Sequence, residues 1–375
     1  MNLILNKIQE IRKGIPFLID HKNTNRYRIV ALESDGSKTA YYFATPIYNS
    51  TTRKIVDLTF HSNGETTYCT GSNANITIAE QIHMENNEGC CLFSRSARAI
   101  KSSEHELLVG HERILPTTNG IAMEYTFQDS CAYVFSMEIN KPFLEVQAND
   151  KCFALMSDTF RPFVTISCIG TLDQNKNIIS PAKLSYQKIT DRKYTITITP
   201  CSPLGKGLLI EANLYEPKLL QDTTVESKNP KTNNAFGGVG FIGTTKEFGE
   251  QWLYSRPDFS VLSDLNDKKI IRAQLHLPKL NYAEVNLVAS EVASRFCSFG
   301  STWNNKIAAT PLKIPSQHTQ HYVNLDITPI ISNNFHRLLR GEGFILKPQN
   351  KNSGFSVIAT GDSYLFPQIL EIHYR

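Results

Sequence analysis

Aromatic side chains in one stretch of the sequence have the chemistry that a sugar-binding surface needs. Trp252 and Tyr254 alternate along Trp252-Leu-Tyr-Ser-Arg-Pro-Asp258, and Trp303 follows in Ser301-Thr-Trp-Asn-Asn. An aromatic ring can stack on the C–H face of a sugar while polar neighbours bind its hydroxyl groups. Large aromatic residues are also common in protein cores, and Trp303 fits that alternative. We therefore predict Trp252 and Tyr254 as the platform of a carbohydrate site.

Arginine side chains lie close to these aromatic residues in the sequence. Arg256 belongs to the same stretch, and Arg272 belongs to the alternating stretch Ile270-Ile-Arg-Ala-Gln-Leu-His-Leu277, with Lys279 two residues beyond it. A guanidinium group can bind a carboxylate through two parallel hydrogen bonds, so these residues could contact the uronate groups of an acidic polysaccharide. The simpler alternative is solvated charge on an exposed strand face. Arg256 and Arg272 are the basic residues that we predict at a ligand site.

Oxygen-bearing side chains in the last third of the chain could hold a structural calcium ion. The candidates are Asp222, Asn229, Asn233 and Asp326. Calcium prefers about six to eight oxygen ligands, so four scattered candidates fall short of a calcium motif. His318 and His321 have a metal-like spacing, but a zinc site needs three or four ligands. We expect no cofactor, with structural calcium kept as an alternative.

The sequence contains no pattern that predicts catalysis. It has no Gly-x-Ser-x-Gly element and no recognisable paired-carboxylate motif. The glycine-rich segment 237–243 does not join a strand to a helix, so it does not predict a phosphate-binding loop. We therefore expect a protein that is not an enzyme.

Eight cysteines are present, seven of them before residue 202, and their spacing shows no disulfide framework. Several lie within strand-like runs, and cysteine is among the residue types that are most often buried. Chains without a secretory signal usually keep their thiols reduced. We expect most of these cysteines to be free thiols packed in a core.

Composition and charge narrow the class of protein. The chain has 375 residues, of which 41% are hydrophobic and 20% charged, which predicts a folded protein of two or three domains. The net charge of +4 comes without any run of Lys or Arg, so we expect no nucleic-acid partner. No apolar run reaches the length of a membrane-spanning helix, so we expect no membrane span.

The first residues, Met1-Asn-Leu-Ile-Leu-Asn-Lys-Ile-Gln-Glu10, do not resemble a Sec signal peptide. Polar residues interrupt the apolar stretch, and no small-residue cleavage site follows. We expect the protein to be extracellular or on a cell, spore or virion surface that it reaches without a Sec signal. A cytoplasmic location is the alternative.

Short β segments dominate the chain. Residues 26–33 and 38–45 are rich in aromatic and β-branched residues, and Ser34-Asp-Gly-Ser37 between them is typical of a hairpin turn. Similar segments recur at a spacing that favours sandwiches or barrels over βαβ units. Residues 3–15 predict a short amphipathic helix, with an N-terminal strand or arm as the alternative.

We predict an all-β, multi-domain fold of antiparallel sandwiches with a jelly-roll-like C-terminal module. The expected domains are a β-rich N-terminal domain with a short arm or helix (1–140), a small β domain or continuation of the first (141–220), and a C-terminal sandwich (221–375). Segment 216–234 contains Pro217, Pro230 and many polar residues, so we expect it to be the linker that leads into the last module.

The last third of the chain carries a recognisable series of sequence elements. They are Asp222, Val225, Asn229, Pro230, Asn233, Gly237 and Gly243 in the opening strand and turn, then Ser301-Thr-Trp-Asn-Asn, Val323-Asn-Leu-Asp-Ile-Thr and the closing Pro367-Gln-Ile-Leu-Glu-Ile-His-Tyr374. In this order they resemble the DNRLRE domain. The chain departs from a frequent form of that family at the second strand, where Trp252-Leu-Tyr-Ser-Arg-Pro-Asp258 replaces an Arg-x-Leu-x-Phe-Asp pattern.

The resemblance implies a function at a surface. DNRLRE domains are β-sandwich modules of bacterial cell-surface and secreted proteins, and some relatives are classed as family 96 carbohydrate-binding modules, which bind acidic polysaccharide. We therefore expect a non-enzymatic bacterial surface or assembly protein, such as an appendage, spore-surface or virion subunit. It would associate with itself or with other surface proteins, and its N-terminal arm would pair with a neighbouring sheet edge. The alternative is a protein that recognises a polysaccharide through the C-terminal sandwich.

Overall fold

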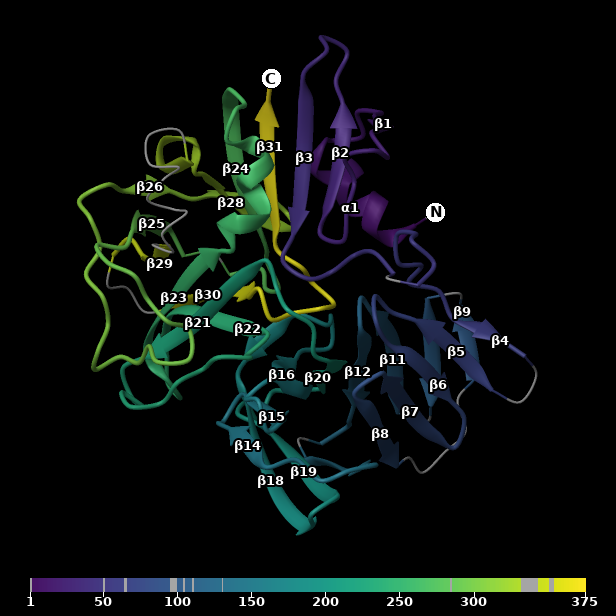
Figure 1. Cartoon of the computed structure of the whole chain (residues 1–375). Helices are drawn as coiled ribbons and strands as arrows, with labels where there is room; N and C mark the ends of the chain where they lie inside the picture. Colours follow the sequence, from purple (N-terminus) through teal and green to yellow (C-terminus); the bar gives the residue numbers. More distant parts are fainter. Residues whose placement is uncertain are drawn as a thin grey trace.

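The chain folds into four antiparallel sheets that stack on one another (Figure 1). The structure, a computed structural model, describes residues 2–49, 51–63, 66–94, 100–103, 105–109, 111–129, 131–283, 285–331, 343–350 and 354–375. Almost all regular secondary structure in these ranges is β-strand. The helical elements include helix α1 (Leu3–Ile11) and the 3₁₀ turn η1 (Phe259–Leu265). The prediction of an all-β fold of antiparallel sandwiches is confirmed.

The first sandwich consists of an eight-stranded and a nine-stranded sheet. The eight-stranded sheet has the order β18 (Ala182–Thr190), β19 (Lys193–Pro200), β13 (Tyr133–Ile139), β8 (Gly89–Ser94), β7 (Gln81–Asn86), β6 (Asn75–Ile78), β5 (Thr67–Thr70) and β4 (His61–Ser62). The nine-stranded sheet has the order β14 (Glu145–Ala148), β15 (Cys152–Met156), β16 (Pro162–Leu172), β20 (Gly207–Leu214), β12 (Gly120–Thr126), β11 (Glu112–Thr117), β10 (Glu106–Val109) and β9 (Ile100–Ser103), with β17 (Ile178–Ser180) paired to β16.

A single apolar core fills this sandwich. Every second residue of β19 points inward, so Tyr194, Ile196 and Ile198 are buried. They pack with residues such as Phe153 and Phe163 of the nine-stranded sheet. Alternation of this kind is the pattern of a strand with one face on a core and one in solvent.

The second sandwich consists of two seven-stranded sheets. One has the order β1 (Leu18–Ile19), β2 (Arg28–Leu32), β3 (Lys38–Phe43), β31 (Ile369–Tyr374), β24 (Ile270–Pro278), β28 (Tyr322–Asp326) and β27 (Gln317–His318). The other has the order β26 (Ile314–Pro315), β25 (Leu287–Glu291), β29 (Phe344–Pro348), β23 (Gly249–Pro257), β22 (Val239–Thr245) and β30 (Gly354–Ala359), with β21 (Leu220–Glu226) paired to β23. The predicted alternation of β24 is confirmed for Ala273, Leu275 and Leu277, which all enter the core between these sheets. Ile271, which we expected on the same face, is 40% exposed, because the pairing with β31 shifts register between Ile270 and Arg272.

The two sandwiches are joined face to face by a smaller apolar layer. Ala122 and Leu209 of the nine-stranded sheet pack there with Phe241 and Val357 of strands β22 and β30. The sheets therefore stack in four layers. Burial of this third apolar layer favours a fixed arrangement of the two sandwiches over independent motion.

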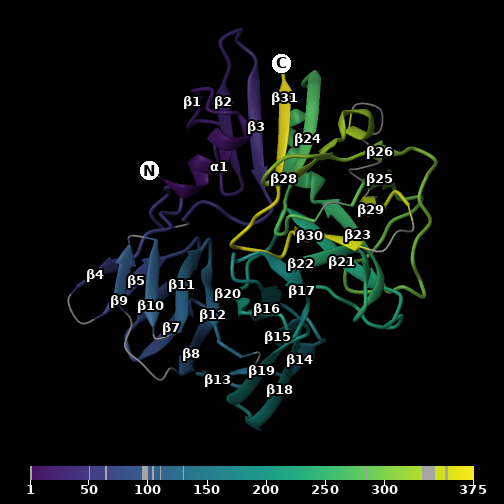
Figure 2. The same ribbon diagram turned by 180° about the vertical axis from the view of Figure 1, so that it is seen from behind.

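Helix α1 covers the remaining face of the sheet that contains β2 and β3 (Figure 2). Ile4 and Ile8 are fully buried against Ile29 and Tyr41. Asn2 caps the helix, because its Oδ1 accepts hydrogen bonds from the amides of the second and third residues after it. The helix predicted within residues 3–15 is confirmed, and it ends at Ile11.

The first and last parts of the chain share one sheet. Strand β3 pairs with β31 from Lys38 opposite Tyr374 to Phe43 opposite Ile369, and the C-terminal strand lies between β3 and β24 (Figure 1). The nine-stranded sheet likewise joins β12 to β20. Strands from both sides of the limits expected near residues 140 and 220 are thus paired. Whether the three expected domains can each fold alone stays a prediction.

The prediction of a linker over residues 216–234 is wrong. Much of this segment is buried, and it contains strand β21. Glu216 forms an ion pair with Arg26, and Lys218 forms one with Asp362. The polar residues that indicated a solvated linker are therefore paired with charges from distant parts of the chain.

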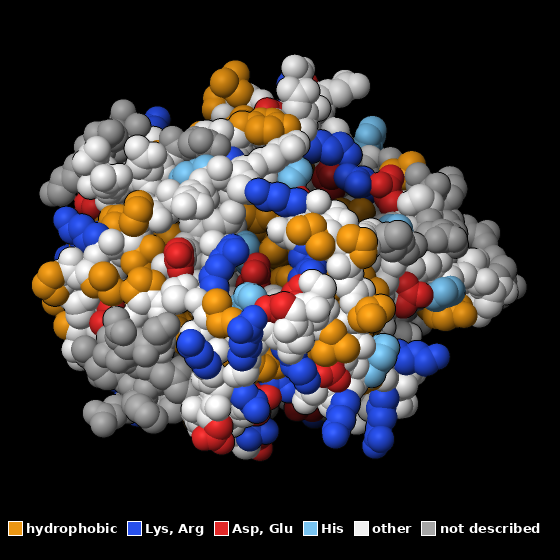
Figure 3. All heavy atoms as spheres, turned by 90° about the horizontal axis from the view of Figure 1, so that it is seen from above, with side chains coloured by type: hydrophobic (Ala, Val, Ile, Leu, Met, Phe, Trp, Pro, Cys, Tyr) orange, Lys and Arg blue, Asp and Glu red, His pale blue; other side chains and the backbone are white. Residues whose placement is uncertain are grey.

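All eight cysteines are free thiols, with Cys69, Cys91, Cys152 and Cys168 buried and Cys131 and Cys297 exposed. Burial raises the pKa of Cys69 to about 12, so this thiol stays protonated at neutral pH. Within the described ranges, no helix is both long and apolar enough to cross a membrane. On the face that Figure 3 shows, Lys and Arg side chains are interspersed with acidic and apolar ones.

Candidate functional site

Strand β23 presents the predicted aromatic residues on the face that points away from the core of the second sandwich. Leu253 faces that core, so Trp252, Tyr254 and Arg256 point to the opposite side. Segment 292–313 covers much of this side, and its Val292 and other apolar residues form a small separate core there. The three residues that the sequence grouped together do share one face.

Trp252 and Trp303 form a half-buried aromatic pair at the edge of this cover. Their ring centroids are 4.9 Å apart, with an angle of 50° between the ring planes. The indole N–H of Trp252 donates a hydrogen bond of 2.9 Å to Oε1 of Glu250. This bond and the contact with Trp303 fix the orientation of the Trp252 ring. We call these two residues, with the lysines described next, the tryptophan patch.

Two lysines surround the pair, and sequence reasoning missed both. The ammonium group of Lys306 lies 4.3 Å from the centroid of the Trp303 ring, and that of Lys347 lies 5.4 Å from the centroid of the Trp252 ring. Lys347 follows Leu346, which is paired with Leu253 of β23. Cations prefer aromatic faces at such distances. Only the pairing of β29 with β23 brings Lys347 here, and the sequence gives no sign of that pairing.

The other predicted ligand residues lie elsewhere or are covered. Tyr254 is 1% exposed, and its hydroxyl donates a 3.0 Å hydrogen bond to the carbonyl of Ile307, so its ring faces no solvent. Arg256 is half-buried and binds Gln221, and burial together with the charge of Arg295 lowers its pKa.

Arg272 lies on β24, in the opposite sheet of the second sandwich, where it is exposed and binds Gln274. Of the four predicted ligand residues, only Trp252 belongs to the tryptophan patch.

The predicted calcium ligands do not converge. The side-chain amide of Asn229 donates to Glu226, and that of Asn233 donates to the carbonyls of Ser298 and Ser301. Asp326 is on the sheet opposite Asp222 and accepts hydrogen bonds from Thr328. Among the described residues, no group of three or more His, Cys, Asp or Glu side chains could hold a metal ion.

Asp222 instead belongs to a buried carboxyl pair. It is 3% exposed, and it accepts a hydrogen bond from the amide of Gly361. Burial, followed by the charge of Asp362, raises the pKa of Asp222 well above its usual range, and a hydrogen bond between the two side chains raises it further. Asp362 is also paired with Lys218. The arrangement predicts that Asp222 is protonated and donates to Asp362, which in turn faces Lys218.

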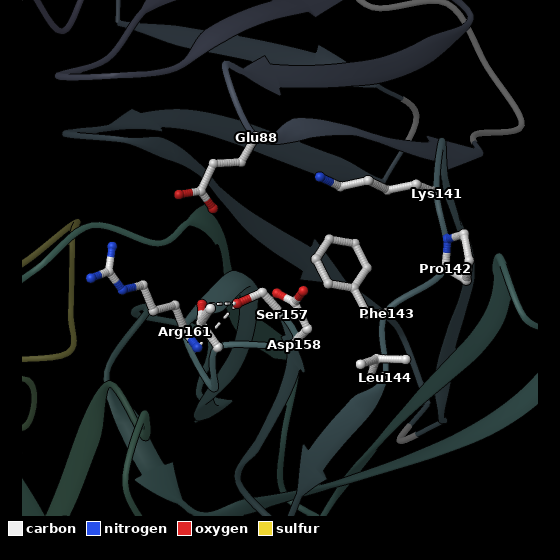
Figure 4. A pocket seen from close by; sticks show the side chains of 9 residues that line it. Glu88, Lys141, Pro142, Phe143, Leu144, Ser157, Asp158 and Arg161 are labelled. Atoms are coloured by element: carbon white, nitrogen blue, oxygen red, sulfur yellow. Dashed lines mark hydrogen bonds between the residues drawn. The ribbon is translucent and has the colours of Figure 1, made fainter.

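A groove of about 480 Å³ opens at one end of the first sandwich (Figure 4). Its lining comes from three connections, and it consists of Glu88, Lys141, Pro142, Phe143, Leu144, Ser157, Asp158, Thr159 and Arg161. None of these residues was predicted from the sequence. The Phe143 ring lies among the polar side chains; the Lys141 side chain extends past this ring, and the Glu88 carboxylate points toward the side of the groove where Arg161 lies (Figure 4).

Comparison with known proteins adds no relative, since no protein-family model and no curated protein matches this chain.

Proposed function

We propose that this chain is a non-enzymatic surface protein of the adhesion type, and that its tryptophan patch binds an acidic polysaccharide. The observation that carries the proposal is the pair Trp252–Trp303 with Lys306 and Lys347 beside the rings. The resemblance of residues 222–374 to DNRLRE domains supports it. The exposed part of an indole ring can stack on a sugar ring, and the lysines can meet the sugar's carboxylates.

The charge of the patch favours an acidic ligand over a neutral one. The patch has two positively charged side chains, Lys306 and Lys347, and one neighbouring carboxylate, that of Glu250. This carboxylate already accepts a hydrogen bond from the Trp252 indole. Lys306 is exposed and Lys347 half-buried, so both ammonium groups are close to solvent. Attraction between such exposed groups and a polyanion weakens as salt is added. Retention on an acidic polymer should therefore fall with ionic strength.

The test is retention of the whole chain on an immobilised polyuronate, with a neutral polysaccharide of similar size as the comparison matrix. We expect the pair Lys306→Gln/Lys347→Gln to lower retention by about tenfold or more, since hydrogen bonds to charged groups contribute about 1.5–3 kcal/mol. Trp252→Ala should also lower retention, because it removes the ring on which the sugar would stack. Tyr282→Ala is the matched control, because Tyr282 is an aromatic residue with 73% exposure outside the patch. If all these variants were retained equally, the tryptophan patch would not be the polysaccharide-binding site.

Self-assembly is a second candidate function, favoured by strand β18. This strand is the edge of the eight-stranded sheet, and all residues from Ser185 to Thr190 are exposed, including Tyr186 at 41% and Ile189 at 49%. The β18–β19 hairpin projects from the body of the molecule (Figures 1 and 2). An exposed edge strand can add a strand from another chain.

We place the assembly contact at β18 rather than at the N-terminal arm expected from the sequence. The N-terminal residues form helix α1, whose apolar side is buried on its own sheet. If β18 mediates association, Ile189→Lys should convert an oligomer to a monomer in size-exclusion chromatography with light scattering. Leu204→Lys changes an equally apolar, 76% exposed residue outside the strand and should leave the oligomer intact. A wild-type chain that stays monomeric at high concentration excludes this candidate.

A further inference from the structure

The groove of the first sandwich is built from three connections at one end of the two sheets. Glu88 lies in the β7–β8 turn, residues 141–144 join β13 to β14, and residues 157–161 join β15 to β16. Loops at the end of a rigid sandwich are a common place for ligand sites. The tryptophan patch is on the other sandwich, so the two places are separate.

Packing and hydrogen bonds hold these loops in place. The Oδ1 of Asn140 accepts a 3.1 Å hydrogen bond from the amide of Cys90, and the amide of Asn140 donates to the carbonyl of Cys90 at 3.2 Å. A Cβ atom on Gly89 would lie 2.9 Å from that Oδ1, so glycine allows the close approach. Phe143 stacks on the fully buried Phe163, with centroids 4.8 Å apart and ring planes at 13°. The groove is therefore preformed.

The turn over residues 157–161 adds further order and an exposed aromatic ring. The amide of Ser157 donates to the carbonyl of Arg161 at 2.8 Å, and the amide of Arg161 donates to the Oγ of Ser157 at 3.2 Å. Phe160, between two lining residues, has a φ of 56° and is 69% exposed. Left-handed backbone is unfavourable for a bulky residue, and such strain often accompanies a binding role.

The charged groups of the lining are balanced in sign and not engaged with one another. The lining has two acidic side chains, Glu88 and Asp158, and two basic ones, Lys141 and Arg161. Its formal charge is therefore zero. No ion pair or side-chain hydrogen bond joins any of these four charged groups to another described residue; the Lys141 ammonium group lies 5.9 Å from the Phe143 ring centroid. Their capacity to donate and accept hydrogen bonds is therefore unused within the part of the chain that the structure describes.

We propose that this groove is a second ligand site, which takes a short neutral oligosaccharide. Sugar hydroxyl groups both donate and accept, so they can bind carboxylates, cationic groups and the hydroxyls of Ser157 and Thr159 without bringing a net charge. The C–H face of a sugar ring can pack against Leu144, which is 81% exposed, and against the edge of the largely buried Phe143. A volume of about 480 Å³ falls in the range of pockets that enclose small organic ligands. A polyanion gains no net attraction here, because the formal charge of the lining is zero.

The experiment screens the whole chain against neutral di- and trisaccharides by saturation-transfer NMR, with affinities from calorimetry. The panel contains glucose-, galactose-, mannose- and N-acetylglucosamine-based sugars, oligouronates, and extended uncharged peptides. The test variants are Asp158→Asn and Arg161→Gln, both at exposed positions. The control is Glu138→Gln, an exposed carboxylate on β13 outside the lining.

We expect at least one neutral sugar to bind, with affinity lowered about tenfold or more in both test variants and unchanged in Glu138→Gln. Binding should also persist in Trp252→Ala, which separates this site from the tryptophan patch. The proposal is overturned if no neutral sugar binds, if sugar binding survives both groove variants, or if only oligouronates or peptides bind. Circular dichroism of each variant verifies that it is folded.

Discussion

The carboxyl pair Asp222–Asp362 shows, at the scale of single residues, how the second sandwich buries charge. Lys218 neutralises Asp362, while Asp222 keeps a proton because burial and its neighbour disfavour a second negative charge. A carboxyl group whose pKa is raised in the folded state binds its proton more tightly there than in the unfolded chain. This group therefore stabilises the fold less as the pH rises above its unfolded pKa of about 3.9.

Asp222→Asn should remove this pH dependence, because an asparagine amide can donate to Asp362 as the protonated acid does. Above pH 4 the wild type loses up to about 1.4 kcal/mol of stability per pH unit through this group, until the pH passes the raised folded pKa. The melting temperature of the variant minus that of the wild type should thus grow from pH 4 to pH 8. A difference that stays constant over this range would contradict a protonated Asp222.

The tryptophan patch shows which site residues a sequence can reveal. Trp252 was predicted because an aromatic residue on an alternating strand is visible locally. Tyr254 was predicted by the same rule, yet segment 292–313 covers it, and no local pattern indicates that cover. Packing and strand pairing between residues distant in sequence bring Lys306 and Lys347 to the tryptophan patch. The sequence alone could therefore not predict that these lysines belong to the site.

At the scale of elements, the β14–β15 hairpin is tied to β21 by a buried ion pair. The ammonium group of Lys151 lies 2.6 Å from Oε2 of Glu226 and 3.2 Å from the hydroxyl of Thr224. The two charged side chains are 2% and 1% exposed. Glu226 also accepts a 2.7 Å hydrogen bond from Gln251. The pair connects the turn between β14 and β15 of the first sandwich to strand β21 of the second, so it helps to fix the relative position of the two sandwiches.

Lys151→Ala should destabilise the chain by about 3–5 kcal/mol, because it leaves the Glu226 charge buried without its partner. Urea unfolding of the whole chain measures this loss. Lys188→Ala is the matched control, since Lys188 pairs with Asp191 on the surface, and exposed pairs contribute little. Equal effects of the two substitutions would show that the Lys151–Glu226 pair is solvated and that the junction is loose.

Local sequence patterns predict a strand or turn correctly where contacts between residues close in sequence determine it. The hairpin of β2 and β3 was predicted from its β-rich segments and Asp-Gly turn, and their pairing is confirmed. The prediction of a linker over residues 216–234 is wrong because contacts with residues distant in sequence determine the structure of this segment. Glu216 and Lys218 are charged, so the sequence suggests that solvent surrounds them. In the structure Glu216 is paired with Arg26, 190 residues away, and Lys218 is paired with Asp362, 144 residues away. Burial of such charges depends on tertiary structure alone.

At the scale of the whole molecule, the pairing of β3 with β31 makes the second sandwich depend on both ends of the chain. Val30, Ala40 and Tyr42 from the N-terminal strands lie in the same core as Leu370 and Ile372. A fragment of residues 216–375 would lack these core residues and would expose one edge of β31.

We therefore expect the fragment 216–375 to be aggregated or to unfold without a cooperative transition, while the whole chain unfolds cooperatively. Size-exclusion chromatography and thermal unfolding followed by circular dichroism measure both properties. A monomeric fragment that melts cooperatively at the temperature of the whole chain would show that the C-terminal module folds alone, as the domain limits expected from the sequence imply.

The proposed polysaccharide site can be observed directly, because the chain contains two tryptophans and both belong to the patch. All tryptophan fluorescence therefore reports on Trp252 and Trp303. We would titrate the whole chain with a soluble polyuronate while recording its emission spectrum. The account predicts a saturable change in emission that high salt reverses and that a neutral polymer does not cause. Retention on the polyuronate without any change in tryptophan emission would contradict it and place the ligand elsewhere.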